Sequence, residues 1–228
     1  PARALARLVP NSARGFGALA LALAAALALF LWAHPDRALY TGDASLRHGA
    51  FAALDHPEKL AEQALRGDLV LHYSAPRWVT AHTPWSAEQA GRAQGALLAV
   101  VTALAAWRLA VSLRADGTHG AVALAALTVA ACTGALALDN GYGKASVEVA
   151  CLTSIAAVGV TQAARTGRGL GTVGLAVGAA LLLHRSALLL LPAWAACAGL
   201  VLRTGSRARA STLVGLCAPP LALAVVGP

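Results

Sequence analysis

The sequence predicts an all-α fold, an integral membrane helical bundle with about seven transmembrane helices and a helical outer loop after the first. Of the 228 residues, 58% are hydrophobic and only 12% are charged, and the mean hydropathy is +0.64. Soluble domains carry about 25% charged residues, so this apolar surplus needs lipid as a solvent. The basic residues lie between the apolar runs rather than in one patch, so we expect membrane lipids as partners and no nucleic acid.

Seven apolar stretches approach the roughly 20 residues that a helix needs to cross the hydrocarbon. The first follows a basic segment, as in a signal peptide. Its apolar core exceeds the usual length of about 7 to 15 residues and no small-residue cleavage pattern follows it, so we favour an uncleaved helix. The fifth and sixth are separated only by His184 and Arg185; we favour two helices over a re-entrant hairpin or one interrupted helix. The seven stretches are 16–33, 93–113, 120–138, 145–164, 170–183, 186–202 and 210–226.

The arginines orient these helices, because short loops rich in Lys and Arg stay on the cytoplasmic side. With the N-terminus inside, the short outer turns hold only Lys144 and Arg185. This topology describes a multi-pass protein of a bacterial plasma (inner) membrane with a cytoplasmic N-terminus. The inner segments hold Arg3, Arg7, Arg14, Arg114, Arg165, Arg168, Arg203, Arg207 and Arg209.

The chain is expected to form a single transmembrane domain, 1–228, with its outer loop at 34–92. Because it begins with Pro1 and has no Met, we expect a piece of a longer protein, incomplete at one or both ends. Within the loop, 43–53 and 57–66 are predicted to be short helices that lie along the membrane surface. Three aromatic residues further along the loop suit interfacial anchoring: Tyr73, Trp78 and Trp85.

Nine of the ten acidic residues map to the outer side, which indicates where any chemistry lies. Seven of them are in the loop 34–92, Asp139 is in the second outer loop, and Glu148 lies about one turn inside the fourth span. Only Asp116 is cytoplasmic. Since Asp and Glu contribute little to topology, this distribution is independent of the arginine rule.

The first candidate cluster, Tyr40 to His48, follows the first span. On a helix that begins near Asp43, Arg47 lies one turn further on the same face, so the two side chains could orient each other. His48 follows directly. Asp43 could also simply cap this helix, because Asp is favoured at N-cap positions, and the residues alone favour capping.

The second cluster is Asp139-Asn140-Gly141-Tyr142-Gly143-Lys144, followed by Glu148. An ionisable group within an apolar helix is costly, so we interpret Glu148 as functional rather than structural. Lys144 lies four residues before Glu148, close enough for a pair that could be purely structural.

The third cluster is His184-Arg185-Ser186, between two apolar runs near the same outer surface. Arg185 could bind phosphate through its planar donor fork. It could equally extend toward lipid headgroups. The sequence supports both interpretations to the same degree.

The order of these features resembles bacterial multi-pass glycosyltransferases of the GT-C fold over most of the chain. The resemblance rests on the Gly-Asp in the outer loop, on Gly-Tyr-Gly before a helix that carries Glu, and on His-Arg-Ser-Ala-Leu-Leu-Leu-Leu-Pro. It implies sugar transfer from a polyprenyl-phosphate-linked donor at the extracytoplasmic face. The family usually has more than seven helices, and its turn often lacks a basic residue such as Lys144. The implied roles are catalytic for Asp43 and Glu148, donor phosphate binding for Arg47, Arg185, His184 and Lys144, and cleft lining for His48 and Tyr142.

The sequence contains no recognisable metal-binding motif, and it leaves two other classes of function open. No metal-ligand spacing such as His-Glu-x-x-His occurs, so we expect no cofactor, although carboxylates could bind a divalent metal. A transporter or lipid flippase would need charges near the membrane midplane and helices broken by Gly or Pro, for which Pro192 and Pro219-Pro220 are candidates. The charges lie at helix ends instead. A noncatalytic scaffold, whose outer loop binds a partner, is the third class.

Overall fold

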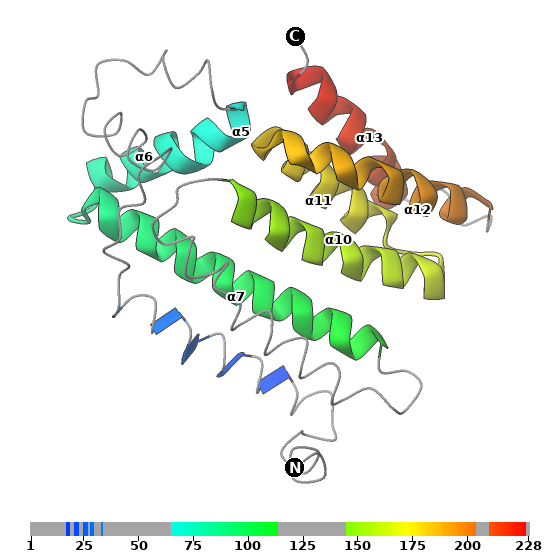
Figure 1. The fold of residues 1–228 in the computed structure, drawn as a ribbon, viewed down its shortest axis with the longest axis horizontal. Helices are drawn as coiled ribbons and strands as arrows, with labels where there is room; N and C mark the ends of the chain where they lie inside the picture. The colour runs from blue at the N-terminus through cyan, green and yellow to red at the C-terminus, as the bar shows by residue number, and fades with distance from the viewer. Residues whose placement is uncertain are drawn as a thin grey trace.

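The computed structural model describes residues 65–113, 145–203 and 210–226, together with isolated helical positions between 17 and 33. Every element in this part is a helix, which confirms the all-α class for these residues (Figure 1). The elements are α5 (Arg66–Leu69), the π-helix η1 (Val70–Ser74), α6 (Ala75–His82), α7 (Ala87–Leu113), α10 (Ser146–Thr166), α11 (Leu170–Leu183), the 3-10 helix η3 (Arg185–Leu190), α12 (Leu191–Arg203) and α13 (Ala210–Val226).

Five of the seven apolar stretches coincide with helices: α7, α10, α11, η3 with α12, and α13. Most of the stretch at 16–33 and all of that at 120–138 lie outside the described residues. α11 ends at Leu183 and His184 is extended, which confirms two helices in place of one interrupted helix. In the part that the structure describes, one helix, Arg185–Arg203, is long and apolar enough to cross a membrane. Ala96–Leu109, Leu170–Leu183 and Ser211–Val226 are apolar but shorter.

The outer loop differs from its prediction. The helix predicted at 43–53, and most of that at 57–66, lies outside the described residues, and Leu65 is extended rather than helical. A helix that the sequence did not predict begins at Arg66 and continues to His82. Pro76 explains the π-helical turn in it, because a proline ring clashes with the carbonyl four residues earlier in a regular α-helix. That carbonyl belongs to His72, and the wider π turn relieves the clash.

α11 and α13 run parallel and pack through small residues. A Cβ added at Gly171 would lie 2.7 Å from the Ser211 carbonyl oxygen, and one added at Gly174 would collide with the Gly215 carbonyl. A Cβ at Gly178 would lie 3.1 Å from the Ala218 carbonyl oxygen. Small residues that let helix backbones approach closely are typical of packing between membrane helices.

A proline in α13 is matched by a tryptophan in α12. Pro219 is buried within the helix and has no N–H to donate to the carbonyl of Gly215, four residues earlier. The Trp194 indole Nε1 donates to this carbonyl oxygen instead, at 2.8 Å. Freed backbone groups inside a membrane must find such partners from neighbouring helices.

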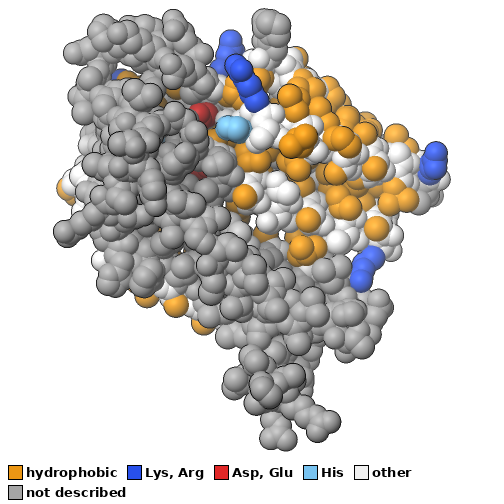
Figure 2. All heavy atoms as spheres, viewed as in Figure 1, with side chains coloured by type: hydrophobic (Ala, Val, Ile, Leu, Met, Phe, Trp, Pro, Cys, Tyr) orange, Lys and Arg blue, Asp and Glu red, His pale blue; other side chains and the backbone are white. Residues whose placement is uncertain are grey.

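α11 forms the centre of the core, and leucines cover the outside. Leu170, Val173 and Val177 on α11 are at most 1% exposed. In contrast, Leu189 before α12 is 82% exposed and Leu221 on α13 is 65% exposed. Figure 2 shows hydrophobic side chains spread over this face, with acidic and histidine side chains at the α5 end. Exposed apolar surface of this kind marks contact with a membrane or with another protein.

Candidate functional site

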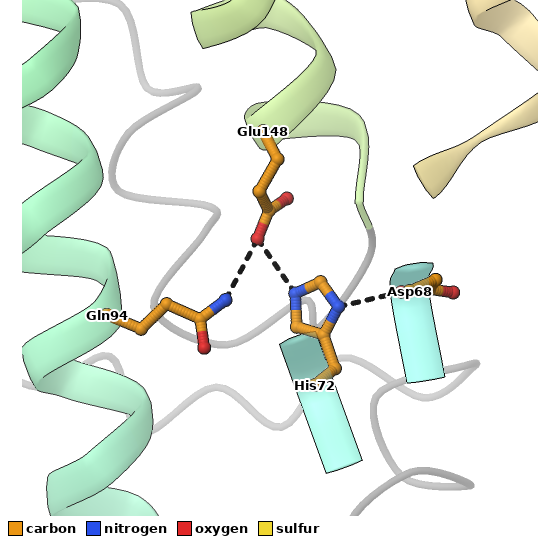
Figure 3. Close-up of polar contacts among 4 residues, drawn as sticks. All are labelled: Asp68, His72, Gln94 and Glu148. Atoms are coloured by element: carbon orange, nitrogen blue, oxygen red, sulfur yellow. Dashed lines mark hydrogen bonds and ion pairs between the residues drawn. The ribbon is translucent and has the colours of Figure 1, made fainter. Parts of the chain in front are cut away.

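Four side chains from four helical elements meet beside the first turn of α10, and Gln94 reaches them from about two turns into α7 (Figure 3). His72 lies between two carboxylates: its Nδ1 is 2.7 Å from Asp68 Oδ1 and its Nε2 is 2.8 Å from Glu148 Oε1. Gln94 on α7 donates from Nε2 to the same Glu148 oxygen at 3.1 Å. We call these residues the Glu148 cluster.

The Glu148 cluster is buried. Asp68 is 4% exposed and Glu148 is 2% exposed, and the His72 side chain is 14% exposed. Charged groups are buried at this level only when they are paired and hydrogen-bonded. Hydrogen bonds in such a low-dielectric environment are stronger than in water. The cluster is therefore held in one geometry.

The two contacts of His72 determine its protonation state. Both ring nitrogens face carboxylate oxygens, which only accept, so each nitrogen must carry a hydrogen. Burial lowers the pKa of His72, but hydrogen bonds to Asp68 and Glu148 and the charges of both residues raise it from 6.5 to about 9. At neutral pH His72 is an imidazolium without a free lone pair. It acts as a fixed positive charge rather than as a base.

The two oxygens of Glu148 have different surroundings. Oε1 accepts from both His72 and Gln94, whereas Oε2 is buried and has no hydrogen-bond partner in the part of the chain that the structure describes. An unsatisfied buried acceptor costs about 1–3 kcal/mol, and more for a charged group. Among the described residues, Oε2 therefore has no donor to compensate its burial, unlike Oε1. The two other unsatisfied buried side-chain atoms among the described residues belong to the neutral Thr102 and Trp107.

Local structure explains how these residues meet. The π turn that precedes Pro76 carries His72, and π turns occur frequently at functional sites. Gly67 allows this helix to pack closely against the end of α11, because a Cβ at this position would lie 2.6 Å from the Leu182 carbonyl oxygen. Glu148 lies in the first turn of α10, where the helix dipole favours a carboxylate.

Three of the predicted site residues fall within the described residues: Glu148, His184 and Arg185. His184 Nδ1 accepts from the Ser186 backbone N–H at 3.2 Å and so caps η3, a structural role that the sequence did not predict. Arg185 is exposed, three residues beyond Leu182. The predicted site residues outside the described part are Asp43, Arg47, His48, Tyr142 and Lys144.

Three residues of the cluster were missed by the sequence analysis: Asp68, His72 and Gln94. Asp68 and His72 have the i, i+4 spacing of a helix pair, which is a signal that could have found them. It was missed because the segment was not predicted to be helical. Gln94 is 54 residues from Glu148 in sequence, and nothing local marks it.

Within the described ranges, no group of three or more His, Cys, Asp or Glu side chains is arranged to hold a metal ion. Comparison of the chain with protein-family models, with curated proteins and with solved structures finds no match in any of the three.

Proposed function

We propose that this protein is a membrane glycosyltransferase that transfers a sugar from a polyprenyl-phosphate-linked donor to an acceptor hydroxyl at the extracytoplasmic face. Glu148 is the base in this proposal. The observation that carries it is the buried Glu148 carboxylate, with Oε1 held by two donors and Oε2 without a hydrogen-bond partner among the described residues. The choice of a sugar and a lipid phosphate rests on the resemblance to the GT-C family.

The chemistry needs a base next to the acceptor. Glu148 Oε2 accepts the proton of the acceptor hydroxyl while the hydroxyl oxygen forms a bond to the anomeric carbon. The bond from that carbon to the phosphate oxygen breaks, and the polyprenyl phosphate leaves with the electron pair. A positioned base of this kind contributes about 10² to 10⁴ in rate.

His72 supports this role without taking part in proton transfer. Its positive charge lies against Glu148, with Nε2 2.8 Å from Oε1, and compensates the carboxylate in this buried site. Asp68 holds the ring from its other side at 2.7 Å and fixes its orientation. The triad therefore presents one anionic oxygen in a defined direction.

Basic side chains near this site suit the departing phosphate. Arg66 and Arg185 are both exposed, and each lies within three residues of the contact between Gly67 and Leu182. A cation that stabilises the charge developing on a leaving phosphate lowers the barrier to transfer. In this proposal Asp43 orients the acceptor, and Arg47, His48, Tyr142 and Lys144 keep the roles that the resemblance implies.

We include the multi-pass topology with a cytoplasmic N-terminus in the proposal. The hydrogen bond between Gln94 and Glu148 joins the N-terminal parts of α7 and α10. The close approach of Gly67 to Leu182 shows that the C-terminal end of α11 packs against the helix that begins at Arg66. Arg165 and Arg203 lie near the other ends of their helices. This separation supports a site on the side opposite the basic loops. A transporter is less well supported, because Glu148 lies in the first turn of α10 rather than at its middle.

The test uses the full-length protein in lipid nanodiscs with a radiolabelled polyprenyl-phosphate hexose, and measures release of the polyprenyl phosphate. Glu148→Gln keeps the shape of the side chain and removes the base, so release should fall by about 10² to 10⁴. Ser154→Ala is the control on the same helix, because that hydroxyl donates to the Ala150 backbone carbonyl of its own helix. Equal rates for Glu148→Gln and the unmodified protein would reject Glu148 as the base.

A further inference from the structure

We propose that Gln94 is a positioning residue for Glu148: its side-chain amide fixes one carboxylate oxygen so that the other is presented to the acceptor. The inference rests on the proposed function of Glu148 as a base. It adds a residue on α7 to a site that otherwise consists of α10 and the outer-loop helix. No local sequence pattern marks this residue.

Two donors converge on a single oxygen of Glu148. The His72 Nε2 is 2.8 Å from Oε1 and the Gln94 Nε2 is 3.1 Å from it. A carboxylate oxygen has two lone pairs, so Oε1 is fully occupied and basicity is concentrated on Oε2. The amide nitrogen of Gln94 must face Glu148, because an ionised carboxylate accepts hydrogen bonds and cannot donate one.

One donor alone would not fix the carboxylate plane. The terminal torsion of a Glu side chain is broad, so a carboxylate held only by His72 could rotate about the bond that leads to it. Figure 3 shows Gln94 reaching Oε1 from α7 while His72 reaches it from η1. Two anchors on different elements restrict this rotation. They therefore keep Oε2 in one place.

The neutrality of Gln94 also suits a base. The charged groups that face Glu148 from the described elements are His72, in direct contact, and Asp68 behind it. Gln94 adds a second donor to Oε1 without adding a charge to the cluster. Its amide therefore orients the carboxylate through a neutral hydrogen bond, which is weaker than one from a charged donor.

The experiment compares Gln94→Leu with the unmodified full-length protein in nanodiscs. A hydrophobic carbodiimide, which reacts with protonated carboxyl groups, labels Glu148, and mass spectrometry measures the rate at a fixed pH. Loss of a hydrogen bond to the anion should raise this rate by roughly ten- to a hundredfold. With the hexose donor, kcat should fall while the KM for the donor stays the same, because Gln94 orients the base and does not bind the donor.

The control is Gln162→Leu, the same substitution near the far end of α10. It should change neither the labelling rate nor the transfer rate. If Gln94→Leu does not fold, Gln94→Met, an unbranched side chain without a donor, replaces it. Unchanged labelling of Glu148 in a folded Gln94 variant overturns the inference. Absence of transfer by the unmodified protein overturns the proposed function instead, and the labelling rates still decide the role of Gln94.

Discussion

The charge on His72 should make the stability of the protein depend strongly on pH. The pKa of His72 is about 9 in the folded protein, whereas a histidine without these contacts has a pKa of 6.5. The difference corresponds to about 3 kcal/mol of folding free energy. Because the folded-state pKa is the higher one, this stabilisation is fully present below 6.5 and is lost as the pH rises to about 9. His72 belongs to η1, which lies outside the proposed membrane spans.

The assay is denaturant unfolding of the full chain in mixed micelles across this pH window, monitored by tryptophan fluorescence. His72→Gln removes the titrating group and retains a side chain of similar length. The other titrating groups are common to both proteins, so their contributions cancel in the difference between the two unfolding free energies. The difference in unfolding free energy between them should shrink by about 3 kcal/mol from pH 6.5 to 9. Nuclear magnetic resonance of isotopically labelled histidine should show one ring that titrates near 9 and is lost in His72→Gln.

Two results would refute this reasoning. A difference in unfolding free energy that stays constant across the window would mean that His72 binds no more protons in the folded state than in the unfolded state. A His72 ring that titrates near its ordinary value of 6.5 would mean that Asp68 and Glu148 do not hold it as an imidazolium. Either result would remove the fixed positive charge from the proposed mechanism.

Two further predictions concern the helix packing and the outer loop. Trp194→Phe should destabilise the protein by about 1–3 kcal/mol, because the Gly215 carbonyl loses its donor. In a Pro219→Ala background the new backbone N–H can bond to that carbonyl, so a double-mutant cycle should give a smaller penalty, and equal penalties would contradict the proposed pairing. Asp43→Asn should leave folding nearly intact, since Asn caps a helix about as well as Asp. Its transfer rate should fall by about 10²-fold if the carboxylate orients the acceptor, and near-normal transfer would leave capping as its role.

Local properties of the sequence determined five of the helical segments and one member of the site. α11 and α13 begin and end at the residues that the apolar runs predicted, because the length of such a run is a local property. Glu148 was selected for a local reason as well, since a carboxylate in an apolar helix is costly unless something compensates for it. The pair Asp68 and His72 was also within reach, through its i, i+4 spacing.

Only the tertiary structure decided what surrounds Glu148. Gln94 reaches it across 54 residues of sequence, and His72 reaches it because Gly67 seats the outer-loop helix against α11 and a π turn precedes Pro76. The donor for the Gly215 carbonyl likewise comes from another helix. Hydrogen-bond partners of buried groups are set by which helix faces pack together. Periodicity along one helix shows which face is buried, but not which side chain of another helix it will meet.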